Sequence, residues 1–459
     1  MIPPSSEVSV TIVCPVAVGF PCAYAGGNEL GDEIGIGLLG CGIVGSAVTR
    51  ILAANADEIT ERSGAHLTVK RVAVRSLAKE RDVPVPRDLF TNEPDEVVDD
   101  PDVRIVVEVM GGIEPARSLI LKALASGRSV VTANKELLAT LGKELFDEAE
   151  RAGVDLAFEA AVAGGIPIIK PLKESLAGER IRRLMGIING TTNFILTRMS
   201  AEGIEFDQAL AEAKRLGYTE LDPTADIEGF DPAAKVSILA SICFNARVVA
   251  GDVYREGITR VSARDIAFAH RLGYEVKLLG IAEMVDGQVA VRVHPAMIPL
   301  SHPLAAVRDN LNAVFVEGVN VGELMFYGQG AGGPPTGTAV VGDIVDIARN
   351  LTTTSRGVGC TCYRSNARIR HMDETASQYY ILLEVDDRPG VLARVAQTFA
   401  DHGVSIRSMW QEGFADEARL VMVTHRALER NFQALLGALR GLDVVEEVAS
   451  SMRVITDEE

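Results

Sequence analysis

Positive charge is scarce in this chain of 459 residues. Its 45 Lys and Arg stand against 63 Asp and Glu, which gives a formal net charge of −18 at pH 7. A surface of that sign repels the phosphate backbone of nucleic acids and the anionic headgroups of membranes, so both are poor candidate partners. Any small anionic ligand has to be bound by a local group of positive residues.

Aromatic residues are also few, at 5%, and no apolar run is long enough to cross a bilayer. The apolar stretch 11–27 contains Pro15 and Pro21 and has no Lys or Arg before it, so it does not resemble a secretory signal. With 47% hydrophobic residues, the composition is typical of a well-packed soluble protein, which we expect in the cytoplasm. The length predicts about three domains, preceded by residues 1–32, which we interpret as a disordered extension.

Cysteine is sparse as well. The six cysteines lack the density and spacing of a disulfide framework and suit a reducing compartment. Cys360 and Cys362 have no neighbouring His and no second cysteine pair, so we expect unpaired loop thiols there and no zinc site.

Residues 33–160 alternate β-like apolar runs with helical patterns. Such alternation predicts an α/β fold with a doubly wound parallel sheet of the Rossmann type. The expected strands are 34–39, 69–74, 103–109, 129–132 and 155–159, and the expected helices are 44–56, 115–126 and 135–152.

The pattern then changes. Residues 161–330 mix helices with β-rich runs at 275–285, 288–297 and 312–325, which predicts an α+β domain with an open, largely antiparallel sheet. We expect a helix at 338–350 to pack back on the first domain and complete it, as the end of a returning segment 331–350. A polar linker, 351–377, precedes residues 378–455, whose strand-helix-strand-strand-helix-strand order is ferredoxin-like and long enough to fold alone.

A glycine motif lies where the first expected strand meets the first helix. Gly40, Gly42 and Gly45 match G-x-G-x-x-G. The first glycine permits a tight turn, the second lets backbone N–H groups approach a pyrophosphate, and the third allows close packing of helix and strand. We therefore predict that the backbone from Gly40 to Gly45, including Ile43 and Val44, binds a dinucleotide.

The end of the second expected strand bears on the choice of dinucleotide. NAD enzymes usually carry an acidic residue there for the ribose hydroxyls, whereas this chain has Val74-Arg75-Ser76. A cation can meet a 2′-phosphate, so Arg75 favours NADP over NAD. Use of NAD, with Arg75 as an ordinary surface residue, is the alternative.

The segment from Gly217 to Lys235 is dense in carboxylates and ends in a lysine. Asp231 and Lys235 are four residues apart at the start of an apolar helix, where Asp231 suits the N-cap. Taken alone, the pair is an ordinary solvated ion pair. A small zwitterionic substrate, however, needs carboxylates for its ammonium group and lysines for its carboxylate or reacting oxygen.

A second lysine, Lys135, follows the expected strand 129–132 almost directly. Ligands of open α/β sheets gather at the carboxyl ends of the strands, which predicts Lys135 beside the nicotinamide. Reduction of an aldehyde requires a hydride and a proton. A lysine can supply the proton if burial or a neighbouring cation lowers its pKa, and Lys135 and Lys235 are expected to lower each other's.

Six segments of the chain resemble segments of the homoserine dehydrogenase family, and they occur in the same order as in that family. The resemblance implies an NAD(P)-dependent interconversion of aspartate 4-semialdehyde and homoserine, on the route to threonine, methionine and isoleucine. It also implies that residues 161–330 bind substrate and form the interface of a homodimer or homotetramer. The segments are 37–45, 108–116, 131–135, 159–167, 186–194 and 220–235.

The resemblance assigns roles to residues. It implies that Lys235 donates the proton and that Lys135 lies beside it at the substrate and the nicotinamide. Positions that match substrate contacts are Glu220, Asp226, Asp231 and Thr191.

Further matching positions concern the cofactor and a cation. Thr132, Gly217 and Gly330 match positions that border the cofactor, although Gln329 stands where the family commonly has proline. The family also holds a monovalent cation, usually sodium, by carbonyl groups of one loop. The matching residues here are Glu159, Val162, Gly164 and Ile166.

The segment from Leu383 to Ala393 resembles the first strand and turn of an ACT domain. Such domains pair side by side and bind amino acids, which within this family implies feedback inhibition by threonine. Asp387 and Gly390 are the candidate contacts. A module that serves only oligomerisation is the alternative.

Two other functions are alternatives. A different reductase of a small amino-acid carbonyl that acylates a cysteine needs an activated thiolate, but Cys243 lies in an apolar helix and Cys41 in the glycine turn. A non-catalytic amino-acid sensor would not need both Lys135 and Lys235.

Overall fold

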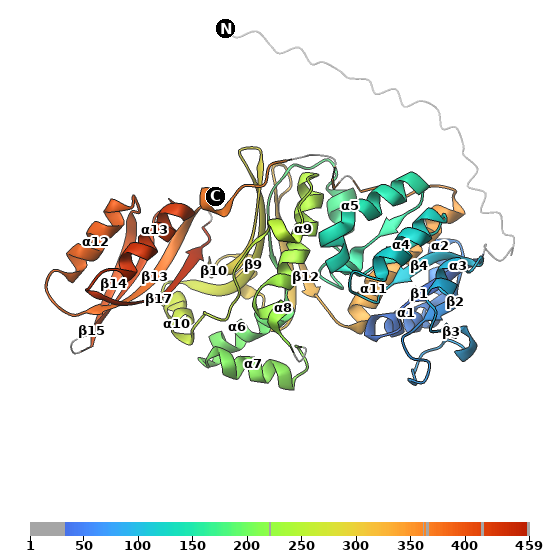
Figure 1. Ribbon diagram of the computed structural model, residues 1–459, viewed down its shortest axis with the longest axis horizontal. Helices are drawn as coiled ribbons and strands as arrows, with labels where there is room; N and C mark the ends of the chain where they lie inside the picture. The colour runs from blue at the N-terminus through green and yellow to red at the C-terminus, as the bar shows by residue number, and fades with distance from the viewer. Residues whose placement is uncertain (1–32, 220–221, 361, 364–366, 415–416, 457–459) are drawn as a thin grey trace, which may run out of the picture.

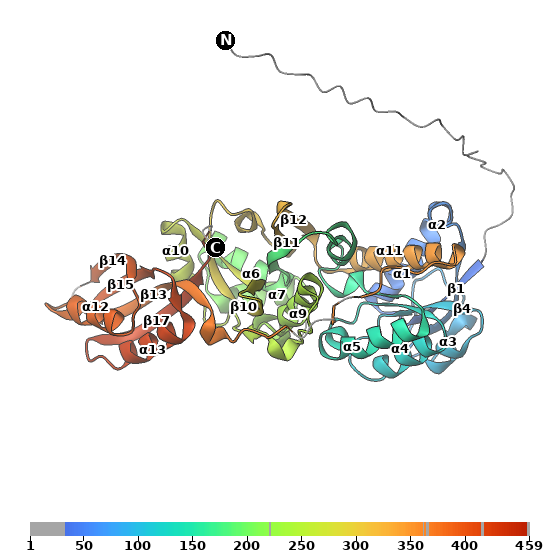
Figure 2. The same cartoon turned by 90° about the horizontal axis from the view of Figure 1, so that it is seen from above.

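The computed structural model describes residues 33–219, 222–360, 362–363, 367–414 and 417–456. The expected N-terminal extension, 1–32, and Glu220 therefore lie outside the described residues. Three bodies follow one another along the long axis in both views, with the N-terminal body at one end and the C-terminal body at the other (Figures 1 and 2). Across the described ranges, no helix is both long and apolar enough to span a membrane.

The N-terminal body is built on a six-stranded parallel sheet in the order β3-β2-β1-β4-β5-β6. This is the order of a doubly wound dinucleotide-binding sheet, so the predicted fold class is confirmed. The central strands are buried on both faces, as their continuous apolar runs predict. The strands are β1 (Glu33–Leu39), β2 (His66–Ala73), β3 (Phe90–Thr91), β4 (Val103–Glu108), β5 (Ser129–Thr132) and β6 (Leu156–Ala157).

Helices α1 (Ile43–Ala54), α2 (Ala56–Ser63), α3 (Asp95–Asp99), α4 (Ala116–Ala125) and α5 (Lys135–Ala152) cover this sheet, and α11 (Gly333–Thr352) returns to it. Close contact between α11 and α1 depends on glycine, because a Cβ on Gly337 would lie 2.9 Å from that of Ala47. The expectation that the late helix packs back is confirmed. It begins five residues earlier than predicted, since Pro334 suits a first helical turn.

The central body carries an antiparallel sheet formed by β7 (Ile181–Ile187), β9 (Tyr274–Val285), β10 (Gln288–Pro299), β11 (Leu311–Gly318) and β12 (Gly322–Gln329). The expected single run 312–325 is a hairpin, because the chain turns between Gly318 and Gly322, the latter at φ +72°. Its helices are α6 (Gly190–Glu202), α7 (Phe206–Arg215), α8 (Thr224–Ile227), α9 (Phe230–Phe244) and α10 (Ala263–Arg271).

The C-terminal body has the predicted ferredoxin-like order, with one short extra strand, β16 (Ala427–Leu428). Its main elements are β13 (Ala376–Asp386), α12 (Val391–Asp401), β14 (Ile406–Phe414), β15 (Glu417–Thr424), α13 (Glu429–Arg440) and β17 (Val445–Val454). Strand β17 pairs in parallel with β10, where Ala296 faces Arg453. The C-terminal sheet therefore continues the central one in a single eleven-stranded sheet.

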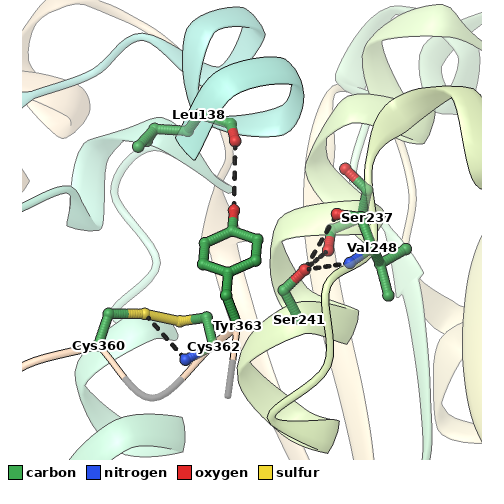
Figure 3. The surroundings of a disulfide bond; sticks show 7 residues. All are labelled: Leu138, Ser237, Ser241, Val248, Cys360, Cys362 and Tyr363. Carbon is green, nitrogen blue, oxygen red and sulfur yellow. Dashed lines mark hydrogen bonds between the residues drawn. A yellow bond between two sulfur atoms is a disulfide. The ribbon is translucent and has the colours of Figure 1, made fainter. Parts of the chain in front are cut away.

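Cys360 and Cys362 form a disulfide (Figure 3). The expectation of two unpaired thiols was wrong, because the chain turns tightly enough to bring their Cα atoms to 5.3 Å, within bonding range. The turn is held against the body of the protein. Cys362 is buried, and the Tyr363 hydroxyl lies 3.5 Å from the carbonyl oxygen of Leu138 in α5.

Candidate active site

The glycine turn between β1 and α1 has the predicted geometry. Gly40 adopts φ +105°, and a Cβ on Gly45 would lie 2.4 Å from the Gly40 carbonyl oxygen. Around Gly42, by contrast, no described atom lies within 4 Å of an added Cβ. Two glycines thus close the turn and the third leaves open space at the N-terminus of α1. This arrangement fits a dinucleotide pyrophosphate.

The same geometry yields a stability prediction. Gly45→Ala forces a Cβ against backbone, so we expect a loss of about 1–3 kcal/mol in unfolding free energy and a lower Tm in thermal unfolding. Gly42→Ala has room for its methyl group and is the matched control, with an expected Tm close to that of the wild type. Equal Tm values for the two variants would contradict the assigned packing role of Gly45.

Arg75 lies exposed just beyond β2, and within the described part of the chain no hydrogen bond or ion pair involves its side chain. A second cation, Arg81, was missed by the sequence reasoning. Its Nε donates to the Cys41 carbonyl oxygen at 3.3 Å, and its Nη1 donates to that of Ser76 at 3.0 Å. Arg81 therefore holds the loop after Arg75 against the glycine turn. It lies in an irregular loop with no motif that could have revealed it.

The carboxyl ends of β4 and β5 share a buried hydrogen bond. Thr132 donates from Oγ1 to Oε2 of Glu108 at 2.6 Å. The other oxygen of Glu108 accepts from the backbone N–H groups of Met110, at 2.8 Å, and Gly111, at 3.0 Å. The Thr132 hydroxyl is thus committed to Glu108, which orders the turn after β4. Glu108 is a positioning residue that the sequence reasoning did not single out.

Two lysines, 100 positions apart in the numbering, bind one carboxylate. Lys135, the first residue of α5, donates to Oδ1 of Asp231. Lys235 of α9 donates to Oδ2 of Asp231 at 2.7 Å and to the Ile188 carbonyl oxygen at 2.8 Å. The side chain of Asn134 caps α5 by accepting from the Leu137 N–H at 3.1 Å. The carboxyl edge of the parallel sheet thus meets the start of α9.

Asp231 is not the N-cap that the sequence suggested. Helix α9 begins one residue earlier, at Phe230, and its N-cap is Gly229 at φ +79°. Asp231 then falls inside the first turn, only 7% exposed, with its carboxylate directed at the lysines. The pair is therefore a buried ionic group and not the ordinary solvated ion pair.

Charge and burial shift the ionisation of this group. Burial lowers the pKa of Lys235, Asp231 raises it, and the charge of Lys135 lowers it again, with a net lowering from the ordinary value. This agrees with the expectation that burial and a neighbouring cation act on Lys235. Burial alone would raise the pKa of Asp231, but the two lysines hold it far below its usual range.

Asn189 connects the two acidic positions of the site. Its Nδ2 donates to Oδ1 of Asp226 at 2.7 Å and to Oδ2 of Asp231 at 2.8 Å. Its Oδ1 caps α6 by accepting from the Thr192 N–H at 2.9 Å. Burial and the charge of Asp231 raise the pKa of Asp226, and the Asn189 hydrogen bond offsets part of that rise. The cap signature before α6 could have identified Asn189.

Thr191 contacts the residue that follows Gly217. The Thr191 hydroxyl donates to the Tyr218 carbonyl oxygen at 2.6 Å, which ties the start of α6 to the loop at the beginning of the acidic segment. Gly217 turns that loop at φ +73°. Glu220 follows in the part of the chain that is not described.

The loop expected to hold a cation has unusual backbone geometry. Ala163 and Gly164 both have positive φ, at 56° and 46°, and a Cβ on Gly164 would lie 2.5 Å from the Gly330 carbonyl oxygen. Within the described ranges, the carbonyl oxygens of Val162, Gly164 and Ile166 accept no hydrogen bond. Oxygen ligands of this kind fit a hard monovalent cation.

Glu159 and Gly330, two residues of this region, are buried. The carboxylate of Glu159 accepts backbone N–H groups of Ile168 and Ile169 at 2.6 and 2.7 Å, so its side chain anchors the loop. A Cβ on Gly330 would lie 1.9 Å from Nδ2 of Asn312. A side chain at position 330 would therefore require the buried Asn312 side chain to move.

The two candidate regulatory residues lie in the turn between β13 and α12, at the end of the molecule opposite the parallel sheet (Figure 1). Gly390 is the N-cap of α12 at φ +93°. The Asp387 carboxylate reaches over β14, since a Cβ on Gly413 would lie 2.8 Å from its Oδ2. These residues are therefore not brought together with the lysines.

Other reactive side chains are poorly suited to chemistry. Burial raises the pKa of the Cys243 thiol to about 12, which opposes thiolate formation. His302 caps a short helix by accepting from the Leu304 N–H at 3.1 Å. His294 is fully buried and its Nε2 has no hydrogen-bond partner among the described residues, so it is less satisfied than an ordinary core histidine.

The open glycine turn lies at the carboxyl edge of a doubly wound sheet, where the buried Lys235 and the partly exposed Lys135 share one carboxylate. Together these features define an NAD(P)-dependent oxidoreductase. Family models support this in three places. They match as "Homoserine dehydrogenase, NAD binding domain" over residues 40–159, "Homoserine dehydrogenase" over 167–345 and "ACT domain" over 379–444.

Similar proteins agree along most of the chain. The homoserine dehydrogenase of Corynebacterium glutamicum is 48% identical over 94% of this chain and 98% of its own length, and that of Mycobacterium tuberculosis H37Rv is 50% identical over 92% and 98%. The crystal structure of a homoserine dehydrogenase from Thiobacillus denitrificans is 43% identical, with a TM-score of 0.87 over 92% of this chain and 98% of that one. The chain belongs to the homoserine dehydrogenase family.

Proposed function

We propose that this chain reduces L-aspartate 4-semialdehyde to L-homoserine, reversibly, with NADPH as the preferred hydride donor. The observation that carries the proposal is the Asp231 carboxylate that binds Lys135 and Lys235 at the carboxyl edge of the dinucleotide-binding sheet. An archaeal homoserine dehydrogenase, 31% identical with a TM-score of 0.59, has been solved "in complex with NADPH", which supports the choice of cofactor.

Lys235 is the proposed proton donor. NADPH, when bound along the glycine turn, supplies the hydride for the aldehyde carbon. Lys235 transfers a proton from Nζ to the developing alkoxide oxygen, and its lowered pKa eases that transfer. Lys135 places a second positive charge at the same oxygen, and Asp231 holds both ammonium groups in position.

The acidic positions are proposed to bind the α-ammonium group of the substrate. Asp226 lies within this network through Asn189, and Glu220 stands six residues before it in the chain. Thr191 holds the chain just before Glu220 by donating to the Tyr218 carbonyl oxygen. Gly217, Thr132 and Gly330 are proposed to border the cofactor, where their backbone approaches it.

The decisive assay follows oxidation of the nicotinamide with aspartate semialdehyde, using NADPH and NADH in parallel, with and without threonine. Turnover is the expected result. No turnover with either cofactor would overturn the proposal and favour a non-catalytic amino-acid sensor. Turnover of other small aldehydes at equal efficiency would favour a different reductase.

Arg75 yields a prediction about cofactor preference. If its guanidinium binds the 2′-phosphate, Arg75→Gln should raise the KM for NADPH about tenfold or more and leave the KM for NADH unchanged. Arg104, exposed on β4, gives the matched control Arg104→Gln, which should change neither value. Parallel increases for both cofactors in Arg75→Gln would contradict a contact with the 2′-phosphate.

Three further features belong to the same proposal. Val162, Gly164, Ile166 and Glu159 would hold sodium through their carbonyl groups. Threonine is the proposed effector of the ACT module, with contacts at Asp387 and Gly390. The chain is proposed to act in the cytoplasm as a homodimer or homotetramer.

A further inference from the structure

Helix α5, which begins with Lys135, is bent at Leu141. The backbone of Leu141 has φ −126° and ψ 15°, outside the helical range, and it divides the helix into a first segment, 135–140, and a second one, 142–152. Proline, which α5 lacks, is one cause of such a bend. A side chain that inserts beside the hydrogen bonds between successive turns is another.

Tyr363 is the side chain that lies at this bend. Its hydroxyl is 3.5 Å from the Leu138 carbonyl oxygen (Figure 3), and a Cβ on Gly142 would lie 2.5 Å from the same hydroxyl. In a regular helix the carbonyl of Leu138 accepts from the N–H of Gly142, so the phenol lies beside the turn that crosses the bend. Burial raises the pKa of Tyr363 to about 12, which keeps the hydroxyl protonated as a donor.

Tyr363 belongs to a segment that follows α5, residues 356–360 and 362–363, which we name the α5 strap. At one end of the strap, Nη2 of Arg356 donates to the Ala149 carbonyl oxygen of α5 at 3.4 Å. At the other end, the Cys360–Cys362 disulfide closes a tight turn, and the Cys362 N–H donates to Sγ of Cys360 at 3.4 Å (Figure 3). Because Cys362 is buried and precedes Tyr363 directly, the disulfide limits where the tyrosine can point.

The bend bears on the position of Lys135, whose ion pair with Asp231 joins the N-terminal body to α9. The residues from Lys135 to Leu141 span about 9 Å of helix, so a tilt of about 10° at the bend moves the helix start by about 1.5 Å. A cavity of about 480 Å³, lined by Leu141, Gly142 and Tyr363 among others, gives the helix room to tilt. A misplacement of about 1 Å at a reacting centre can cost about 10²-fold in rate.

We propose that Tyr363, held in place by the Cys360–Cys362 disulfide, is a positioning residue for Lys135. It fixes the bend of α5 and thereby keeps the Lys135 ammonium group against Asp231. The inference deepens the proposed function and rests on it, because Lys135 acts there at the reacting oxygen. It also gives the α5 strap, which the sequence presented only as part of a polar linker, a role in catalysis.

The pH profile of the reaction tests this position. The charged groups that act on Lys235 are Asp231, Lys135 and Asp226, and Lys135 is the one that lowers its pKa. In Tyr363→Ala the first segment of α5 loses its support, so Lys135 should withdraw from Asp231. The loss of kcat/KM at high pH should then move upward, in the direction expected for Lys135→Met and by no more than that shift.

Two comparisons make this test specific. Tyr274→Ala, which removes another half-buried tyrosine at the start of β9, should leave the profile unchanged. Tyr363→Phe keeps the ring and should shift the profile less than Tyr363→Ala. An unshifted profile in a folded Tyr363→Ala variant, or a further upward shift when Tyr363→Ala is added to Lys135→Met, overturns the inference.

Gly142→Ala approaches the same contact from the side of the helix. Its methyl group would strike the Tyr363 hydroxyl, so this variant should also shift the profile upward. In the Tyr363→Ala background that obstacle is gone, and Gly142→Ala should add nothing, because substitutions that act through one contact are not additive. Additive shifts would show that the two residues act separately and overturn the role of Tyr363 at the bend.

Hydrogen exchange reports on the first segment of α5 without depending on activity. Peptides that cover 135–142 should exchange at least about threefold faster in Tyr363→Ala than in the wild type, because local opening becomes easier. Peptides from α4 should not change. Unchanged exchange at 135–142 overturns the inference, whereas faster exchange in a protein without turnover overturns only the proposed function.

The disulfide is tested by the same exchange measurement with dithiothreitol. This dithiol breaks the bond between Cys360 and Cys362, leaves two thiols there and is itself oxidised to a cyclic disulfide. Reduction should speed exchange at 135–142 in the wild type but not in the double variant Cys360→Ser/Cys362→Ser, where exchange should be fast from the start. Exchange that does not respond to reduction in the wild type overturns the claim that the disulfide holds Tyr363.

Discussion

Lys235→Met is expected to lower kcat for semialdehyde reduction by about 10²- to 10⁴-fold, the range for loss of a positioned general acid. Methionine keeps much of the buried volume but has no proton to give. Asp231 would still be bound by Lys135 and Asn189, so the folded structure should persist. Steady-state kinetics with saturating cofactor measure the effect, and thermal unfolding confirms that the variant is folded.

A surface lysine provides the control. Lys143 lies exposed on α5 and pairs only with the surface residue Asp147 in the described part of the chain, so Lys143→Met should retain wild-type kcat. If Lys235→Met is folded and retains its rate, Lys235 is not the proton donor, and Lys135 would be the remaining candidate.

Asp231→Asn is expected to lower kcat/KM by about 10²-fold or more and to destabilise the fold by about 3–5 kcal/mol, because it leaves a buried lysine without its counter-charge. It should also change the pH profile. Asp231 raises the pKa of Lys235, so its neutralisation lowers that pKa. Reduction needs protonated Lys235, so the loss of rate at high pH should begin at lower pH than in the wild type.

Lys135→Met tests the same electrostatics with the opposite sign. Lys135 lowers the pKa of Lys235, so its removal should move the high-pH loss of rate upward. Profiles of kcat/KM against pH for both variants measure the two shifts. Asp147→Asn, on the surface of α5, should shift neither. Movement of both variants in the same direction would contradict the assignment of the titrating group to Lys235.

Much of the fold could be predicted because its signals are local. Each strand of the parallel sheet is a short apolar run, and each helix between them has its own periodicity. The glycine turn could also be predicted. Glycine is needed at positions 40 and 45 because a Cβ there would collide with backbone a few residues away or just after the adjoining strand. Lys135 was placed correctly at the edge of the sheet by its position after β5 alone.

Other features could be identified only in the folded structure. The hairpin between Gly318 and Gly322 lies inside one apolar pattern, so periodicity could not divide it. The Cys360–Cys362 disulfide depends on how tightly a polar segment turns, which spacing does not reveal. Asn189 has its role because Asp226 and Asp231, some 40 residues further along, fold against it.

The sequence by itself determined the order of the elements and the dinucleotide motif, and it singled out Lys135 and Lys235 as candidates. These features depend on neighbours in the chain. Only the tertiary structure decided that one buried carboxylate holds both lysines and that β17 continues the sheet of the central body next to β10. The physical reason is the same in both cases. Ionisation and strand pairing depend on distances between atoms, and residues far apart in sequence set those distances only when the chain is folded.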